Sequence, residues 1–457
     1  MEAAILTAAV LLLAGYGLRA RLRVLQWMFV PASVTGGLLG LLLIQAGLQQ
    51  PDWSGEVRQL AATLRAWPSW LIAVVFAGLL LEPSRRRLSA SLRGAALNGI
   101  MVWVIVLGQL VLGLAAAWLF ILPAYDVPPA FGQLLEAGFA GGHGTATALG
   151  TILREVLHFD AGLDLGLFMA TVGIVYSVIS GIVLVNIGVR RGWTRSRPSD
   201  LAPRAGPEQR PQPRPIGWAR VRSEVIDPLA FQIVLVALAF LLGVLFRWAA
   251  TAAVQQLGTS ASYLTHIPLF LFTLLGGWAL RGGMAFWGWD HLIDGESIRR
   301  IVAVAMEFLI VAGIASVRVE VVATFLGPLL LLCLVGFVWT AVCVLVLAPI
   351  LLPREHWFEL GLINYGMSTG TTAQGMMLLR IVDEDLESGA AEDYALAAPL
   401  SAPFIGGGVL TMSLPLLLEK VSLPAVIGVL GVAVVGLIVV GQWLNRTRLG
   451  VKDPPSG

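Results

Sequence analysis

The chain has 457 residues, of which 57% are hydrophobic and only 13% are charged. A water-soluble domain carries about 25% charged residues, so this composition excludes a soluble protein of ordinary surface. The formal net charge of +2 says little by itself, and no nucleic-acid partner is expected. Apolar runs recur along the whole length, each long enough to cross or nearly cross a bilayer. The sequence therefore predicts an all-α integral membrane protein with many spans.

Eleven transmembrane spans are predicted in chain order. They lie near 3–18, 24–44, 67–82, 95–122, 165–188, 229–248, 267–284, 301–317, 322–352, 398–418 and 423–444. The first lacks a basic n-region and a cleavage site, so it is interpreted as a retained span. Pro31 and Pro268 are expected to kink the second and seventh spans. Two further segments, 131–155 and 356–380, are too rich in Gly, Ser and Thr to be ordinary spans.

The basic residues indicate an orientation. With the N-terminus outside, 24 of the 30 Lys and Arg residues fall on the cytoplasmic side, as the positive-inside rule requires. This count holds only if 131–155 and 356–380 each return to the side from which they entered. Both are therefore predicted to be re-entrant, in a multi-pass protein of the bacterial inner (plasma) membrane with its C-terminus in the cytoplasm.

An internal repeat is found when the chain is shifted by 226 residues. The segment 144–147 (GTAT) then falls on 370–373 (GTTA), and the span near 3–18 falls on the one near 229–248. Each repeat holds five spans and one re-entrant segment, at 1–189 and 228–420. Because five is odd, the second repeat must enter the membrane from the side opposite to the first. Inverted repeats of this kind are the architecture of alternating-access transporters.

Two regions lie outside the repeat. The Arg- and Pro-rich stretch 190–227 is interpreted as a disordered cytoplasmic linker, and binding to anionic membrane lipid is its alternative role. The segment 421–457 adds a peripheral C-terminal span and a tail. Cys333 and Cys343 both lie in one apolar run and are expected to be packing residues.

The first re-entrant segment is dense in glycine between positions 138 and 144. Such density interrupts a helix and leaves backbone groups without helical partners, which in a membrane must be buried in protein or face a wet cavity. N–H groups at the start of the short helix predicted from Thr147 suit a carboxylate, and unwound carbonyls suit Na⁺. The substrate-binding candidates here are Gly141, Gly142, His143, Gly144, Thr145 and Thr147.

The second re-entrant segment is dominated by hydroxyl groups, whose neutral oxygens can ligate Na⁺ or bond to a substrate carboxylate. The substrate-binding candidates are Ser368, Thr369, Gly370 and Gln374, and the Na⁺ candidates are Gly366, Thr371 and Thr372. The alternative is a pair of tightly packed turns in which small residues only permit close approach. The two segments occupy matching positions in the repeat, which favours a binding site for substrate or Na⁺ over tightly packed turns.

Two ionisable residues are open to two interpretations each. His143 either couples transport to a proton or fixes its hairpin by hydrogen bonds. Glu307 lies well inside an apolar span and joins the Na⁺ candidates. A protonated or Arg-paired structural role is the alternative for Glu307.

The sequence at Ala140–Thr145 (AGGHGT) resembles the glutamate:sodium symporter family of bacterial inner-membrane proteins. That family carries a Ser/Ala-Gly-Gly-His-Gly-Thr motif in its first re-entrant segment. Val30-Pro31 with Gly36-Gly37 is similar to its Pro-rich entry into a Gly-Gly span. The resemblance covers roughly residues 1–420. In the second segment the family has a GATPTA-type loop, whereas this chain has GMSTGTTA at 366–373.

The resemblance implies a homodimeric, elevator-type uptake carrier for glutamate, with Na⁺ as the coupling ion and no other cofactor. The departure in the second segment leaves open a Na⁺- or H⁺-coupled carrier of another small carboxylate, such as a hydroxycarboxylate. An intramembrane enzyme needs a nucleophile with a base or a metal cluster, and the predicted spans hold no such arrangement. No catalytic residue is therefore assigned. A channel or scaffold protein is a further alternative.

Overall fold

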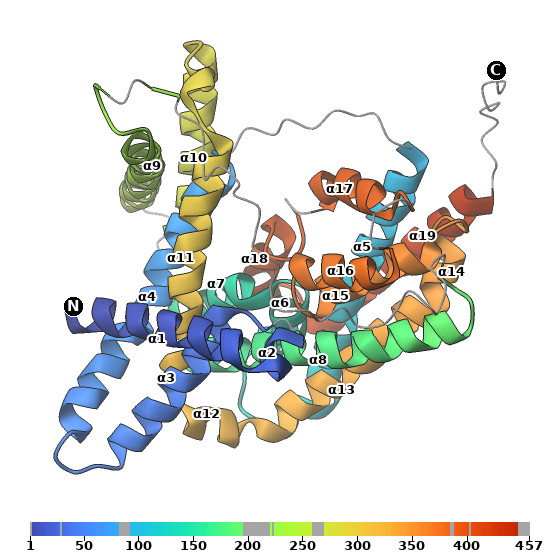
Figure 1. Cartoon of the computed structure of the whole chain (residues 1–457), viewed down its shortest axis with the longest axis horizontal. Coiled ribbons are helices and arrows are strands. Elements are labelled where there is room, and N and C mark those ends of the chain that lie inside the picture. The colour runs from blue at the N-terminus through green and yellow to red at the C-terminus, as the bar shows by residue number, and fades with distance from the viewer. Residues whose placement is uncertain are drawn as a thin grey trace. The chain divides into compact units, whose positions relative to one another are not determined.

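The computed structural model describes residues 2–27, 30–81, 92–194, 220–221, 224–257, 269–383, 388–401 and 404–446. Within these ranges every regular element is a helix, and no β-strand is present (Figure 1). Eight helices are long and apolar enough to cross a membrane, and the shorter apolar helices Ala32–Leu48 and Val409–Leu418 accompany them. The predicted all-α membrane class is confirmed, whereas the number of eleven spans stays a prediction.

The helices form two compact units, each assembled from segments that are distant in the sequence. The first unit consists of Met1–Arg85, Ala146–Phe168 and Ala205–Ala323, and the second of Arg86–Thr145, Met169–Arg204 and Thr324–Gly457. Two helices, α7 (Gly142–Glu155) and α8 (Gly162–Arg190), begin in one unit and end in the other.

The remaining helices each belong to one unit, and α12 is grouped with the first unit because only its last residue, Thr324, lies beyond it. The first unit holds α1 (Glu2–Arg21), α2 (Arg23–Trp27), α3 (Ala32–Leu48), α4 (Ser54–Leu79), α9 (Pro228–Leu257), α10 (Leu269–Phe286), η5 (Asp290–Leu292), α11 (Gly295–Ala315) and α12 (Val319–Thr324). The second holds α5 (Leu92–Ala116), η1 (Ala117–Ile121), η2 (Pro129–Gln133), α6 (Leu134–Phe139), α13 (Leu326–Val342), η6 (Cys343–Leu347), α14 (Ala348–Leu351), α15 (Trp357–Thr369), α16 (Thr372–Val382), α17 (Ala390–Ser401), α18 (Val409–Leu418) and α19 (Leu423–Arg446).

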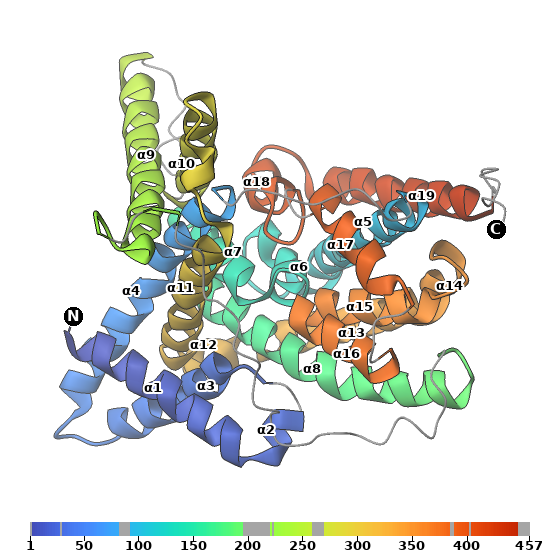
Figure 2. The same ribbon diagram turned by 45° about the horizontal axis from the view of Figure 1, so that its top comes forward.

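Two pairs of helices in the first unit cross at glycines. A Cβ on Gly36 of α3 would come within 2.3 Å of the Leu11 carbonyl oxygen in α1. A Cβ on Gly276 of α10 would come within 2.1 Å of the Ala239 carbonyl oxygen in α9. Figure 2 shows the second pair, α9 and α10, side by side. Only glycine permits backbones to approach so closely, so each crossing is fixed by a residue without a side chain.

The next glycine of each pair contacts a helix from the other half of the chain. A Cβ on Gly37 would lie 2.8 Å from the Ile314 Cβ in α11, and one on Gly277 would lie 2.3 Å from the Ala77 carbonyl oxygen in α4. Helix α3 therefore packs between α1 and α11, and α10 packs between α9 and α4. The two Gly-Gly helices occupy corresponding places in the first unit.

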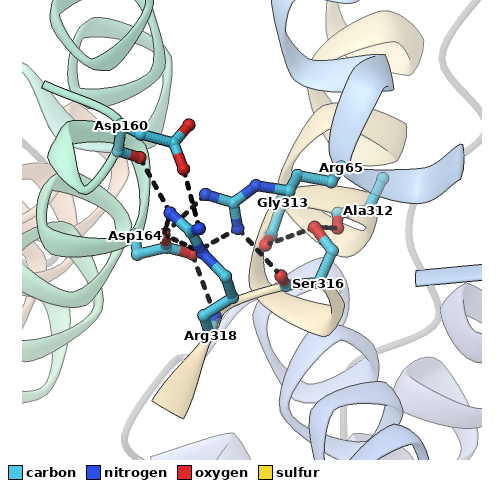
Figure 3. Close-up of polar contacts among 7 residues, drawn as sticks. All are labelled: Arg65, Asp160, Asp164, Ala312, Gly313, Ser316 and Arg318. Atoms are coloured by element: carbon cyan, nitrogen blue, oxygen red, sulfur yellow. Dashed lines mark hydrogen bonds and ion pairs between the residues drawn. The ribbon is translucent and has the colours of Figure 1, made fainter. Parts of the chain in front are cut away.

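A buried carboxylate joins three segments of the first unit (Figure 3). Asp164, at the start of α8, accepts two hydrogen bonds of 2.6 Å from the Arg65 guanidinium in α4. It also accepts from the backbone N–H, Nε and Nη2 of Arg318, at 2.9, 3.1 and 3.0 Å. Burial lowers the pKa of Arg318, but the charges and hydrogen bonds of Asp164 and Asp160 outweigh this effect and the net shift is upward. The start of α8 is thereby held to α4 and to the connection between α11 and α12.

Helices α5 and α13 of the second unit share an unusual ending. Each runs into a π-helical turn, at Ala117–Ile121 and at Cys343–Leu347, and the two turns are 226 positions apart. The helices also contact each other, because the Trp339 Nε1–H of α13 donates to the Ile105 carbonyl oxygen of α5 at 2.9 Å. A π-helical turn is rare and commonly lies at a functional position.

Long apolar side chains are exposed on the outer helices of both units. Leu13 of α1 is 71% exposed and Val432 of α19 is 75% exposed. Such surfaces are stable where lipid, rather than water, surrounds the helix. Cys333 and Cys343 are buried free thiols, in agreement with the packing role that the sequence predicts.

Several predicted boundaries differ from the structure. Helix α4 begins at Ser54, well before the predicted 67, because its first turns carry charged residues that a search for apolar runs excludes. The predicted span 24–44 is divided at Pro31, and 322–352 is divided into α12, α13, η6 and α14. The single span predicted at 398–418 is wrong, since α17 ends at Ser401 and α18 begins only at Val409. Most of the predicted linker 190–227 lies outside the described residues, as do Pro268 and the tail after Arg446.

Candidate functional site

The first re-entrant segment is a helical hairpin with a glycine break. One arm consists of η2 and α6, and the other is α7. The Gly141 N–H closes the first arm by donating to the Glu136 carbonyl oxygen at 3.0 Å, and Gly142 takes a φ of +66° that only glycine adopts without strain. The second arm starts at Gly142 rather than at the predicted Thr147. His143, Gly144 and Thr145 therefore lie in the first turn of α7, not in a loop.

The second re-entrant segment is also a broken pair of helices. Helix α15 ends at Thr369, and the Thr371 side chain caps α16 by accepting from the Gln374 N–H at 3.3 Å. The two arms cross at Gly366 and Gly375, because a Cβ on Gly366 would come within 2.4 Å of the Gly375 nitrogen. Gly370 forms the break between them. A Cβ there would lie 1.8 Å from the Gln374 Oε1, so this side-chain oxygen lies directly against the break.

The two breaks lie next to each other within the second unit. A Cβ built on Gly142 would be 3.5 Å from the Gly370 carbonyl oxygen. The shift of 226 residues aligns Gly144, two positions after Gly142, with Gly370, so the structure brings together the two segments that the sequence aligned. Two helix starts, those of α7 and α16, therefore begin close to one point.

A third interrupted segment joins them. Between α17 and α18, Gly406 and Gly407 take φ values of +63° and +103°. The Thr145 hydroxyl donates to the Gly406 carbonyl oxygen at 3.2 Å, and a Cβ on Gly407 would lie only 2.5 Å from the Thr145 Oγ1. The break that replaces the predicted tenth span thus packs on the start of α7.

Glu136 connects the first hairpin to this third break. It is fully buried, and its Oε1 accepts from the Gly406 N–H at 3.0 Å and from the Thr411 hydroxyl at 2.9 Å. Three residues earlier, the Gln133 Nε2 donates to the Thr411 carbonyl oxygen at 2.5 Å. The Gly406 N–H lies in the break, and the Thr411 carbonyl oxygen lacks its helical donor because the residue four positions later is Pro415, so these contacts satisfy backbone groups that have no partner within a helix.

Side-chain hydrogen bonds join the second hairpin to the backbone and side chains of α5 and α8. Gln109 of α5 donates to the Ser368 carbonyl oxygen at 2.8 Å, and Ser177 of α8 donates to the Gly366 carbonyl oxygen at 3.4 Å. Gln374 donates to the Ile174 carbonyl oxygen at 3.1 Å. The side-chain oxygens of Gln109 and Gln374 are buried and have no hydrogen-bond partner within the described part of the chain. They are free to accept from an ammonium group or to ligate a cation.

The hydroxyls of the second hairpin mostly bind their own backbone. Ser368 and Thr369 both donate to the Tyr365 carbonyl oxygen, at 3.3 and 2.6 Å, while Thr372 lies 3.4 Å from the Tyr394 hydroxyl. Each of these oxygens keeps lone pairs, so the expected contacts to Na⁺ and substrate stay predictions.

The two ionisable candidates lie in different environments. His143 is buried, and its Nε2 lies 3.2 Å from the Thr171 hydroxyl of α8, which is the contact expected of a histidine that fixes its hairpin. Glu307 is a half-buried residue of α11 in the first unit. Thr147 likewise belongs to the first unit, and its buried hydroxyl has no partner among the residues described. The roles of all three as site residues stay predictions.

Comparison with known proteins decides the family. The model of the sodium/glutamate symporter family matches residues 1–356, which is more than half of the chain. The chain belongs to the sodium/glutamate symporter family. The predicted resemblance is confirmed, and the chain is a multi-pass membrane protein of a transporter family rather than an enzyme. No curated protein and no solved structure matches it.

The matched part of the chain ends immediately before the second hairpin. It includes the whole first hairpin with the GGHGT sequence, but it stops at His356, one residue before α15. The second hairpin is therefore outside the match, although the resemblance was expected to extend to about residue 420. This is the segment in which the hydroxyl-rich sequence departs from the GATPTA-type loop.

The sequence did not predict several residues of the candidate site. Glu136 and Gln133 fall inside the predicted re-entrant segment but precede its glycines, and Gln109 lies in an apolar span. Gly406 and Thr411 were assigned to an ordinary span. The run of three glycines at 406–408 was the available signal for the third break, and an acidic residue within a re-entrant segment was the signal for Glu136.

Proposed function

We propose that the protein carries glutamate or a related small carboxylate across the bacterial inner membrane in symport with Na⁺, by alternating access. The observation that supports this most is the meeting of the two hairpin breaks, Gly142 and Gly370, within one unit. Helix starts present N–H groups that suit a carboxylate, and carbonyl and amide oxygens beside them suit an ammonium group and Na⁺. The family itself is Na⁺-coupled.

The site residues of the proposal are those that the sequence predicts, and two of them, Thr147 and Glu307, lie in the first unit and are proposed from the sequence alone. The substrate-binding residues of the proposal are Gly141, Gly142, His143, Gly144, Thr145, Thr147, Ser368, Thr369, Gly370 and Gln374, and the proposed Na⁺ ligands are Gly366, Thr371, Thr372 and Glu307. The open oxygen of Gln374 against the Gly370 break supports a role for these residues in ligand binding.

The two halves 1–189 and 228–420 are proposed to be inverted repeats. Two observations support this: the π-helical turns 226 positions apart, and the pairs of Gly-Gly crossings in the first unit. Elevator-type movement would then separate a transport domain, the unit that contains both breaks, from a scaffold, in a homodimer of chains with about eleven spans each. The N-terminus is proposed to be outside and the C-terminus in the cytoplasm.

A second candidate is a Na⁺- or H⁺-coupled carrier of another organic anion, such as a hydroxycarboxylate. The observation that favours it is the position of the second hairpin beyond the end of the family match. Its hydroxyl groups differ from the glycine and proline of the family loop, so the substrate contacts of this half differ as well.

Uptake into proteoliposomes tests the function. An inward Na⁺ gradient should drive saturable accumulation of labelled glutamate, and replacement of Na⁺ by choline should abolish it. Competition with unlabelled dicarboxylates and hydroxycarboxylates separates the two candidate substrates. Equal accumulation without Na⁺ would contradict Na⁺ coupling, and uptake that never exceeds the external concentration would indicate a channel.

A further inference from the structure

The carboxylate of Glu136 is satisfied on one side only. Its Oε1 accepts the two hydrogen bonds from Gly406 and Thr411, whereas its Oε2 is buried and has no hydrogen-bond partner within the described chain. Two donors on Oε1 favour the ionised form. An ionised carboxylate without a counter-charge is costly in a dry interior, and no cationic side chain in the described part of the chain pairs with it.

Oε2 is therefore the open oxygen of this carboxyl group. It is buried and has no hydrogen-bond partner among the described residues, whereas Oε1 already accepts from two donors. A bound cation satisfies both requirements, because it supplies the missing positive charge and needs oxygen atoms that are not already occupied by donors.

A second open oxygen lies one helical turn away. Gln133 is fully buried, and its Oε1 also has no partner among described residues, while its Nε2 donates to the Thr411 carbonyl oxygen. Gln133 and Glu136 are three positions apart at the η2–α6 junction and both contact Thr411. Residues at this spacing share one side of a helix. The two open oxygens are hard donors, which Na⁺ prefers over softer ligands.

We propose that Glu136 and Gln133 ligate a Na⁺ ion at the contact between the first hairpin and the break between α17 and α18. This inference rests on the proposed Na⁺ coupling and assigns the ion to residues other than the hydroxyls of the second hairpin. The ion is linked to the substrate region through Gly406, whose N–H binds Glu136 and whose carbonyl oxygen binds Thr145. Binding of Na⁺ would therefore stabilise the start of α7 in the position that the GGHGT sequence gives it.

The experiment measures Na⁺ binding by the thermal stability of the purified full-length protein without any substrate. A ligand that binds only the folded state raises the unfolding temperature. Titration with NaCl should raise the unfolding temperature of the wild type when choline chloride is used to keep the ionic strength constant. Glu136→Gln should shift the Na⁺ concentration of half-maximal effect upward by about tenfold or more. Gln133→Met should shift it in the same direction by a smaller factor, and the exposed Glu419→Gln serves as the matched control.

Each outcome has a defined meaning. An unchanged Na⁺ midpoint in Glu136→Gln overturns the proposal even when Na⁺ still drives uptake. Should that variant not fold, an unchanged midpoint in Gln133→Met does the same. A third outcome is a wild-type unfolding temperature that depends on pH but not on Na⁺, with the pH dependence lost in Glu136→Gln. That result would assign a proton to the site and would also overturn the proposal. Na⁺ stabilisation that depends on Glu136 in a protein that takes up no glutamate would support the ion site and contradict only the proposed substrate.

Discussion

Asp164 is a buried carboxylate held by two arginines, and its removal should be costly. Its side chain is 1% exposed, whereas those of Arg65 and Arg318 are 19% and 37% exposed. Taking one partner from a buried ion pair costs about 3–5 kcal/mol, and partial exposure of both arginines reduces this figure. We expect Asp164→Asn to lower the free energy of unfolding by about 2–3 kcal/mol, measured as a fall in thermal midpoint.

The adjacent Asp160 supplies the control for this prediction. It pairs with Arg318 at 2.7 Å but is 60% exposed, so Asp160→Asn should cost no more than about 1 kcal/mol. If both variants lose the same stability, the arginines are not held by the buried carboxylate.

Residues that bind across long stretches of sequence are the part of the site that could not be predicted. The acidic character of Glu136 was visible in the sequence, but its contact with Gly406 was not, because the two residues are 270 positions apart. The glycines of GGHGT were found because a local rule, the incompatibility of dense glycine with a regular helix, applies to them. His143 was predicted with two roles, and only its neighbour Thr171 on α8 makes the hydrogen-bonding role visible.

At the scale of elements, apolar runs predicted where the helices lie but not where they break. Glycine is neither polar nor charged, so the interruption at 404–408 left the apolar run from 398 to 418 intact in sequence terms. The start of α4 was predicted too late for the opposite reason. Its first part contains Glu56, Arg58 and Arg65, so it is helical without being an apolar run. The two hairpins were recognised because their hydroxyl and glycine content differs from that of the spans.

The break in the first hairpin depends on one glycine. Gly142 has a φ of +66°, and a left-handed conformation costs other residues about 1–2 kcal/mol. Gly142→Ala should therefore lower the thermal midpoint and reduce Na⁺-driven uptake, because relief of the strain displaces the start of α7 from Gly370. The control is Gly428→Ala in α19, where a Cβ meets nothing within 4 Å and alanine favours the helix. Wild-type uptake in Gly142→Ala would show that the break does not position the site.

At the scale of the whole molecule, the proposed repeat would account for similar elements in the two halves of the chain. The glycine crossings α1–α3 and α9–α10 and the two π-helical turns recur at corresponding places, although few residues are identical. The evidence for the repeat is therefore the spacing of these glycines and π-helical turns rather than overall sequence similarity. The proposed repeats are inverted only if each holds an odd number of spans, which requires both hairpins to return to the side from which they enter.

Inversion of the two repeats predicts that equivalent loops of the two halves face opposite sides of the membrane. Asp52, between α3 and α4, and Asp290, between α10 and α11, occupy such equivalent loops, and both are exposed. Cys333 and Cys343 are buried and can be replaced by alanine to give a background without thiols. In intact cells an impermeant maleimide should label Asp52→Cys at once, and should label Asp290→Cys only after the membrane is permeabilised. Labelling of both from the same side would mean that the halves are parallel, and an alternating-access mechanism built on inverted repeats would then not apply to this chain.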